Sequence, residues 1–313
     1  MEPTDLIARY RRFIKRRNYS EHTVKNYVNM IGNFIKWLQV PLEQATTKET
    51  DAYMDYLLRR RKKPKTINCY MDCIRTFYNY LIEDEGMPLV NPVRKHYRLR
   101  LPRPLPKHLR DEQVEAFLKE IDDDRDRAMF MVMLRCGLRV QEVARLTVDA
   151  IEYRSRQLCV FNGKGSKDRI VYISEDAQAA LEKYMQKRRL SKEKRVFLVQ
   201  KGLKIGKPIS VRGIQKRMES YAREARIKVS CHHLRHTMAT QLLNADADLV
   251  TIQDLLGHNN ITTTQRYCRV SNLKVQRDYN KAMEIVLQRT QPISDNVSRQ
   301  SGTSIFGGCL DKG

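Results

Sequence analysis

Hydrophobic positions recur every three or four residues through most of residues 1–87, which is the period of an α-helix with one buried face. Such stretches begin at Ser20, at Thr47 and near Pro64, where the local residues favour a helix start. The apolar positions of the first stretch are Val24, Tyr27, Val28, Ile31, Phe34, Ile35 and Leu38. The pattern predicts a small N-terminal domain of helices joined by short turns.

The pattern becomes mixed after Asp111, where helical structure restarts. An almost unbroken apolar run over 128–134 predicts a central core helix, and Ser174 and Ser210 each open a further helix. Three short strands are expected, at Gln157–Phe161, Arg169–Ile173 and Arg195–Val199. The whole chain is therefore expected to be mainly α, with a helical N-terminal domain and a mixed α/β domain that holds a small three-stranded antiparallel sheet.

One stretch near the end of the second domain combines a helix stop with polar side chains. An apolar helix through Leu255 and Leu256 stops at Gly257, a residue suited to a left-handed C-cap. His258 follows, and a threonine run then offers an N-cap for a new helix that carries Tyr267. A tyrosine close to such a break can be presented to a ligand, but tyrosines on short helices more often lie in a core or an interface. The pattern alone leaves both interpretations open.

A basic, proline-rich segment separates the two domains. No acidic residue occurs from Gly86 to Arg110, while seven cationic residues and five prolines keep this segment charged and extended. We therefore expect a helical domain at 1–90, a linker at 91–110, a second domain at 111–290 and a disordered tail at 291–313. The linker is either exposed to solvent or lies along a DNA backbone, and the overall charge favours the second interpretation.

The charge balance indicates the kind of partner. The chain has 59 Lys and Arg against 36 Asp and Glu, a formal net charge of +23. Such an excess favours a polyanion, and nucleic acid is the first expectation. An anionic membrane surface fits less well, because no basic amphipathic helix lies beside an apolar anchor.

Other classes of protein are disfavoured by the same sequence. It has no run of 18 apolar residues that could span a bilayer, and the N-terminus lacks the apolar core of a signal peptide. The seven cysteines are scattered and form no CxxC pair, which argues against a disulfide framework and a zinc ribbon. These features predict a cytoplasmic protein with reduced thiols.

Several basic residues of the second domain lie at positions that suggest a shared ligand. Arg139 lies near a helix start, where anions are favoured, so it is best explained by an anionic ligand that it shares with nearby backbone amides. His232 and Arg235 are three apart on one helical face and can both point at one phosphate. His232 and His236, four apart, could instead bind a metal, but the residue after the first histidine is His233 rather than the glutamate of a zincin.

Together these side chains suit attack on a phosphodiester. Guanidinium groups can bind the nonbridging oxygens on which charge develops, and a lysine on a hairpin, Lys164, can protonate the leaving oxygen. Tyr267 can serve as nucleophile if a neighbour helps to remove its proton, since an unperturbed phenol has a pKa near ~10. A tyrosyl ester would keep the phosphoester energy, so no ATP is expected. Without a carboxylate pair two-metal hydrolysis is unsupported, and no metal or other cofactor is expected.

The order and spacing of four motifs resemble the tyrosine recombinase (phage integrase) family. The motifs are Gly137-Leu138-Arg139-Val140-Gln141-Glu142, Gly163-Lys164-Gly165-Ser166-Lys167-Asp168-Arg169, His232-His233-Leu234-Arg235-His236, and Leu256-Gly257-His258 with Tyr267 nine residues later. The resemblance covers roughly residues 4–290 and is greatest to the simpler, two-domain Xer-like members. Gln141 and Cys231 stand where serine and proline are frequent, and neither change removes a reacting group.

The resemblance implies a role for each matching residue. Arg139 and Arg235 would clamp the scissile phosphate, with Glu142 as the supporting acidic residue of Arg139. Lys164 would be the general acid on the leaving 5′-oxygen.

The resemblance further implies that His232 would assist proton transfer at the nucleophile and that His258 would hydrogen-bond the scissile phosphate. Tyr267 would form a 3′-phosphotyrosyl intermediate, delivered either within its own protomer or to a neighbour.

The resemblance also implies an assembly. The N-terminal core-binding (SAM-like) domain and the catalytic domain would form a C-shaped clamp on duplex DNA, and a homotetramer would join two sites through a Holliday junction. A terminal helix at 274–289 would dock on a neighbouring protomer. Chromosome resolution and mobile-element integration both remain open, as do two alternatives: a non-catalytic DNA-binding protein on this scaffold, and a type IB topoisomerase.

Overall fold

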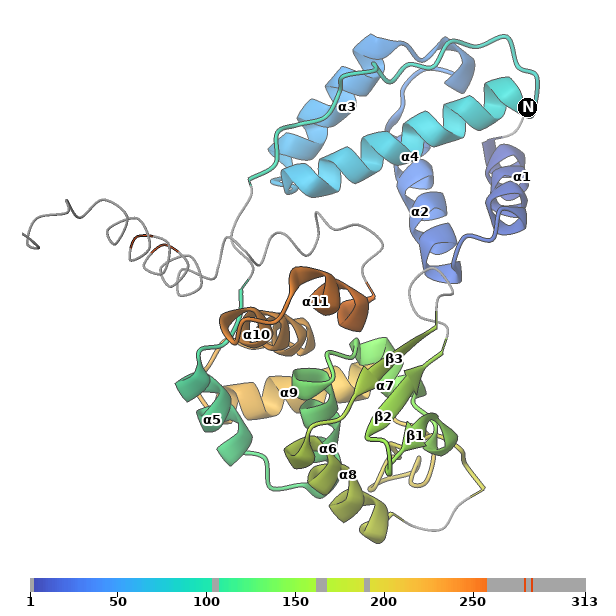
Figure 1. Cartoon of the computed structure of the whole chain (residues 1–313). Coiled ribbons are helices and arrows are strands. Elements are labelled where there is room, and N and C mark those ends of the chain that lie inside the picture. The colour runs from blue at the N-terminus through green and yellow to red at the C-terminus, as the bar shows by residue number, and fades with distance from the viewer. Residues whose placement is uncertain are drawn as a thin grey trace, which may run out of the picture. The chain divides into compact units, whose positions relative to one another are not determined.

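The chain folds into two units, Met1–Pro104 and Leu105–Gly313, each with its own hydrophobic core. The computed structural model describes residues 3–102, 107–161, 168–188 and 192–257, together with Tyr279 and Met283 (Figure 1). The predicted helix at 274–289 and the tail at 291–313 lie outside the described residues, apart from those two positions. The C-shaped clamp concerns the placement of one unit against the other and stays a prediction.

The regular elements of the first unit are all helices in its described part, and residues 84–102 follow the last of them without regular structure. Its elements are α1 (Pro3–Arg16), α2 (Glu21–Trp37), the short 3-10 helix η1 (Leu42–Gln44), α3 (Thr47–Arg59) and α4 (Pro64–Glu83). The Ser20 hydroxyl caps α2 by accepting from the amide of Thr23, and Pro64 occupies the first turn of α4, so the predicted starts of both helices are confirmed. Helix α1 is an additional element that the sequence pattern did not resolve.

The buried side chains of this unit come from one face of each helix. Helix α2 packs against both α1 and α4, and α3 packs against α4. The core includes Leu6, Tyr10, Ile14, Ile31, Phe34, Tyr53, Leu57, Ile67, Phe77 and Leu81. The amphipathic pattern that predicted α2, α3 and α4 therefore supplies most of this core, to which α1 adds Leu6, Tyr10 and Ile14.

The second unit is a mixed α/β domain, as the sequence predicts. Its elements are α5 (Asp111–Lys119), α6 (Asp124–Arg135), α7 (Val140–Arg145), η2 (Val148–Ala150), β1 (Ile151–Glu152), β2 (Gln157–Val160), β3 (Arg169–Tyr172), α8 (Glu175–Lys187), α9 (Val211–Glu224), α10 (Cys231–Asn244) and α11 (Leu249–Leu256). Helix α6 packs against α8 and α10, and residues 128–134 are all buried, which confirms the central core helix.

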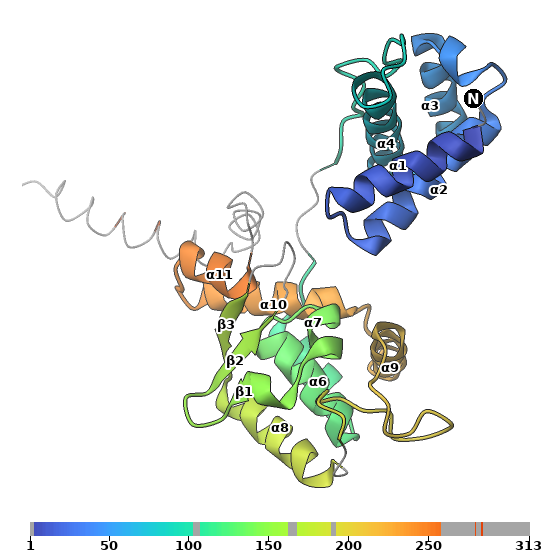
Figure 2. The same ribbon diagram turned by 90° about the vertical axis from the view of Figure 1, so that its right-hand side faces the viewer.

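The three-stranded antiparallel sheet is confirmed, but one of its strands was assigned wrongly. The order is β1-β2-β3. Besides the two predicted strands β2 and β3, the sheet contains β1 (Ile151–Glu152) and not residues 195–199. A short turn joins β1 to β2, so these neighbours in sequence pair directly. Residues 195–199 make only isolated bridges, with Thr147 and Pro208, and so lie outside the sheet. Figure 2 shows β3 at the side of the sheet that contacts α11.

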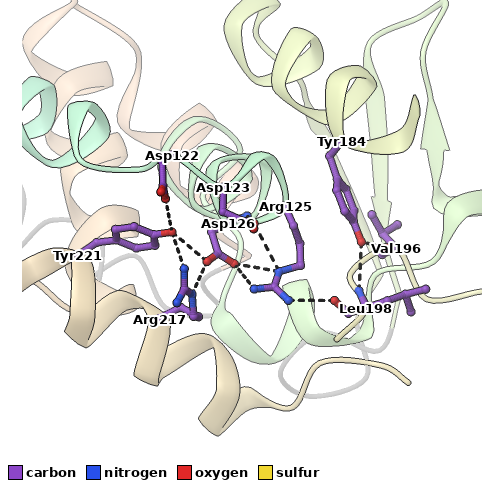
Figure 3. Close-up of polar contacts among 9 residues, drawn as sticks. All are labelled: Asp122, Asp123, Arg125, Asp126, Tyr184, Val196, Leu198, Arg217 and Tyr221. Atoms are coloured by element: carbon purple, nitrogen blue, oxygen red, sulfur yellow. Dashed lines mark hydrogen bonds and ion pairs between the residues drawn. The ribbon is translucent and has the colours of Figure 1, made fainter. Parts of the chain in front are cut away.

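A buried ionic network fixes α9 to α6. Asp126 is fully buried and accepts hydrogen bonds from Arg125 at 2.6 and 2.9 Å, from Arg217 and from the Tyr221 hydroxyl at 3.2 Å (Figure 3). Arg125 also donates to the carbonyl of Leu198 at 3.1 Å. Because a buried carboxylate is stable only when it is paired and hydrogen-bonded, these contacts hold α9 in a defined position.

No helix within the described ranges is long and apolar enough to cross a membrane.

Candidate active site

Arg139 lies at the N-cap of α7, the helix start that the sequence predicts. Helix α6 ends just before it, and Gly137 turns the chain with a φ of +68°, a conformation that side-chain-bearing residues rarely adopt. The backbone amide of Arg139 donates to Glu142 Oε2 at 2.7 Å, and its Nη1 donates to Glu142 Oε1 at 2.8 Å. One carboxylate therefore caps the helix and orients the guanidinium.

Glu142 is shared between two arginines. Nη1 and Nη2 of Arg169 donate to its two oxygens, both at 2.9 Å, in addition to the bonds from Arg139. Burial by itself raises the pKa of Glu142, but the hydrogen bonds and charge of Arg169, with the contacts from Arg139, outweigh burial and lower the pKa to about 2. Glu142 is consequently a permanent anion between two permanent cations.

Arg235 projects from α10 into the interior and is only 1% exposed. One terminal nitrogen donates to the carbonyl of Gly137 and the other to the carbonyl of Leu256. Arg139 Nη2 lies 3.4 Å from the same Leu256 oxygen, a long contact. The structure thus brings Arg139 and Arg235 together, as expected for two residues that bind one anion.

Three arginines converge on the carboxyl end of α11. Arg139 and Arg235 contact the carbonyl of Leu256, and Arg169 Nε donates to that of Leu255 at 2.9 Å. The last carbonyls of a helix have no partner within the helix and carry partial negative charge, so cations stabilise them. Three guanidinium groups against the carboxylate of Glu142 leave two net positive charges, which favours an anionic ligand over a cationic one here.

Helix α11 ends as the sequence predicts. Gly257 has a φ of +58° and a ψ of +52°, the left-handed C-cap conformation. A Cβ atom at this position would lie 3.0 Å from Cδ of Arg169, so a larger residue would also displace that side chain. The chain therefore leaves the arginine cluster at a fixed point, immediately before His258.

His232 lies in the first turn of α10, one turn before Arg235. Burial lowers its pKa, and the charges of Arg235, His233 and Arg139 lower it further. Its ring meets that of His236 edge to face, with 4.2 Å between the centroids. His232 is therefore neutral near physiological pH and able to accept a proton beside the arginine cluster.

Lys164, His258 and Tyr267 lie outside the described residues. The pairing of Val160 with Arg169 shows where the chain that carries Lys164 leaves and rejoins the sheet. Arg169 itself had no assigned role in the sequence, although it was part of a motif. No local pattern in the sequence marks its role, which becomes visible only in the fold, where its side chain is 10% exposed and bound to Glu142.

Comparisons with known proteins show what the chain is similar to. Residues 107–274 match the model of the phage integrase family, and residues 6–86 match that of the phage integrase N-terminal SAM-like domain. The chain is 33% identical over 278 residues to tyrosine recombinase XerC of Haemophilus influenzae strain PittEE, covering 85% of this chain and 92% of the relative. It is 32% identical, with the same coverage, to XerC of Staphylococcus aureus strain RF122.

Solved structures share the fold. The Tn1549 transposon integrase in complex with transposon right end DNA superposes with a TM-score of 0.74 at 19% identity, over 90% of this chain and all of that one. A lambda integrase dimer bound to a COC′ core site superposes with a TM-score of 0.70 at 16% identity, over 85% of this chain and 95% of that one.

Proposed function

The chain belongs to the phage integrase family, and we propose that it is a site-specific tyrosine recombinase that cuts and rejoins duplex DNA at a core site. The XerC relatives, which are matched over most of their length, carry the name of this activity. The observation that best supports this function is that Arg139 and Arg235 both contact the carbonyl of Leu256, in a cluster with net positive charge.

The first chemical step breaks one DNA strand. The Tyr267 phenolate attacks the scissile phosphorus, the bond from phosphorus to the 5′-oxygen breaks, and a 3′-phosphotyrosyl bond forms. Lys164 donates a proton to the departing 5′-oxygen. His232, neutral at the site, takes part in proton transfer at the phenol, and His258 hydrogen-bonds the phosphate.

Arg139 and Arg235 stabilise the transition state, in which charge builds on the nonbridging oxygens. Glu142 keeps Arg139 oriented for this task through the two contacts described above. The second step reverses the first: a 5′-hydroxyl from another strand attacks the phosphotyrosyl bond and releases Tyr267. The phosphoester energy is conserved throughout, so strand exchange requires no ATP.

The active assembly is a homotetramer that holds two sites and exchanges strands through a Holliday junction. The segment at 274–289 docks on a neighbouring protomer. The basic segment 91–110 joins the DNA-binding domain at 1–90 to the catalytic domain at 111–290, and we propose that its cationic side chains lie along the DNA backbone. Its first part packs on the helical unit, where Val93 is buried in the core. Because the XerC relatives are bacterial proteins and bacterial DNA lies in the cytoplasm, we propose a cytoplasmic location.

Covalent capture tests this function directly. The protein is incubated with a pool of nicked suicide duplexes whose core is randomised, and protein–DNA adducts are isolated and the captured DNA is sequenced. We expect an enriched core sequence from the wild type and no adduct from Tyr267→Phe, which retains DNA binding. Failure of the wild type to form adducts with any duplex favours a non-catalytic DNA-binding protein. Adducts with no sequence preference and no strand exchange favour a topoisomerase.

A further inference from the structure

Arg169 connects α7, which begins after Arg139 and carries Glu142, with the carboxyl end of α11. It is the first residue of β3, and its side chain is 10% exposed. Its two terminal nitrogens donate to Glu142 on α7, both at 2.9 Å, and its Nε donates to the carbonyl of Leu255 on α11, also at 2.9 Å. The planar guanidinium group of Arg169 therefore fixes α7 against the carboxyl end of α11.

The contact with Glu142 also affects Arg139. Oε1 of Glu142 accepts from Arg139 Nη1 at 2.8 Å and from Arg169 Nη1 at 2.9 Å. A carboxylate paired with Arg139 alone would cancel the positive charge of Arg139. With Arg169 present, two cations share one anion, and one net positive charge remains for a ligand. A neutral side chain at position 169 would bring this group to zero net charge.

We infer that Arg169 is a positioning residue for the strand-transfer reaction: through Glu142 it holds Arg139 in place and keeps the positive charge of Arg139 available to the scissile phosphate. This inference rests on the proposed function. It assigns Arg169 no contact with DNA, because its donors are directed at Glu142 and Leu255.

The inference can be tested with two versions of the same suicide duplex. One has an ordinary phosphodiester at the scissile position, and the other has a methylphosphonate, in which a methyl group replaces one charged oxygen. We expect Arg169→Met to slow adduct formation about 10- to 100-fold on the phosphodiester, as is typical when a supporting contact of a functional group is lost. The loss should be much smaller on the neutral methylphosphonate, and Arg169→Lys should recover part of the rate by restoring charge.

A double-mutant cycle with Arg139 gives a second measurement. If Arg169 acts through Arg139, the change Arg169→Met has little further effect in a chain that already carries Arg139→Met. Full and independent losses from the two changes would overturn the inference. So would an Arg169→Met chain that reacts as fast as the wild type on the phosphodiester.

Arg125 provides a matched control for a purely structural loss. It is also buried, also binds one carboxylate through two nitrogens and also donates to one backbone carbonyl, but in the network of Figure 3. We expect Arg125→Met to change the rates on both duplexes by the same factor. Equal losses on both duplexes for Arg169→Met as well would overturn the inference. A wild-type chain that forms no adduct with any duplex would instead contradict the proposed function.

Discussion

Arg235 donates a hydrogen bond to the backbone carbonyl of Leu256, the last residue of α11. Its other terminal nitrogen donates to the carbonyl of Gly137, which follows the C-cap of α6. The side chain that we propose to clamp a phosphate thus also joins the ends of two helices. Because a buried cation must have its hydrogen bonds satisfied, this double use makes position 235 sensitive in folding as well as in catalysis.

The first prediction follows from that double use. Arg235→Lys keeps the positive charge, but one ammonium group cannot match the planar, two-donor geometry of a guanidinium. We expect a loss of about 1–3 kcal/mol of folding free energy and a loss of adduct formation of at least about 100-fold. Urea denaturation and the suicide-duplex assay measure the two effects. Arg223→Lys, at an exposed position on α9, is the control and should stay within about 0.5 kcal/mol of the wild type. Unchanged stability in Arg235→Lys would mean that the carbonyl contacts contribute little.

A second prediction concerns the turn before Arg139. Gly137 has a φ of +68°, and a Cβ there would lie 3.0 Å from Sδ of Met238 and 3.2 Å from Cδ2 of Leu256. Gly137→Ala is therefore expected to destabilise the protein by about 1–3 kcal/mol, through backbone strain and crowding. Gly32→Ala is the matched control: Gly32 lies inside α2 with no atom within 4 Å of an added Cβ, so this change should raise stability by up to about 1 kcal/mol. Thermal or urea unfolding of both variants measures these changes in stability, and a Gly137→Ala chain as stable as the wild type would contradict the prediction.

Sequence reasoning succeeded where the signal is local. The stop of α11 at Gly257, the start of α7 after Arg139 and the cap of α9 by Ser210 each depend on a few adjacent residues. Backbone conformation at a glycine and hydrogen bonding at a helix start are decided within one turn, so residue type predicts them well.

Sequence reasoning failed where the contact is distant in the chain. The segment 195–199 has the composition of a strand, but whether it enters the sheet depends on which edge is free, and β1 occupies the place beside β2. Arg169 was overlooked for the same reason, since its partners Glu142 and Leu255 are 27 and 86 residues away. No local pattern encodes those pairings.

A third prediction uses the low pKa of Glu142. Its pKa is about 2 in the folded protein and about 4.5 in the unfolded chain, so the ionised carboxylate stabilises the fold by about 3 kcal/mol at neutral pH. That contribution is complete above about pH 4.5 and is lost as the pH falls towards about 2. Glu142→Gln should therefore be less stable than the wild type by about this amount near pH 7, and the difference should shrink in acid. Urea denaturation at several pH values tests this, with Glu115→Gln at an exposed position of α5 as the control. A difference that does not depend on pH would show that the lost contacts do not involve the charge.

The last prediction concerns His232, whose pKa is lowered by burial and then by the charges of Arg235, His233 and Arg139. At a pH just below the ordinary histidine pKa of about 6.5, His232 is therefore protonated less often in the folded protein than in the unfolded chain. Stability must consequently fall as the pH drops from about 6.5 through the lower pKa of the folded state. His232→Asn should remove this part of the pH dependence of stability, whereas His96→Asn, at an exposed position, should keep it.

An anion held by Arg139 and Arg235 should raise the pKa of His232, because it offsets the positive charges that depress it. NMR titration of labelled histidines, with and without duplex DNA bound to Tyr267→Phe, measures that shift directly. A His232 signal that titrates at the same pH in both states would place the bound phosphate away from this histidine.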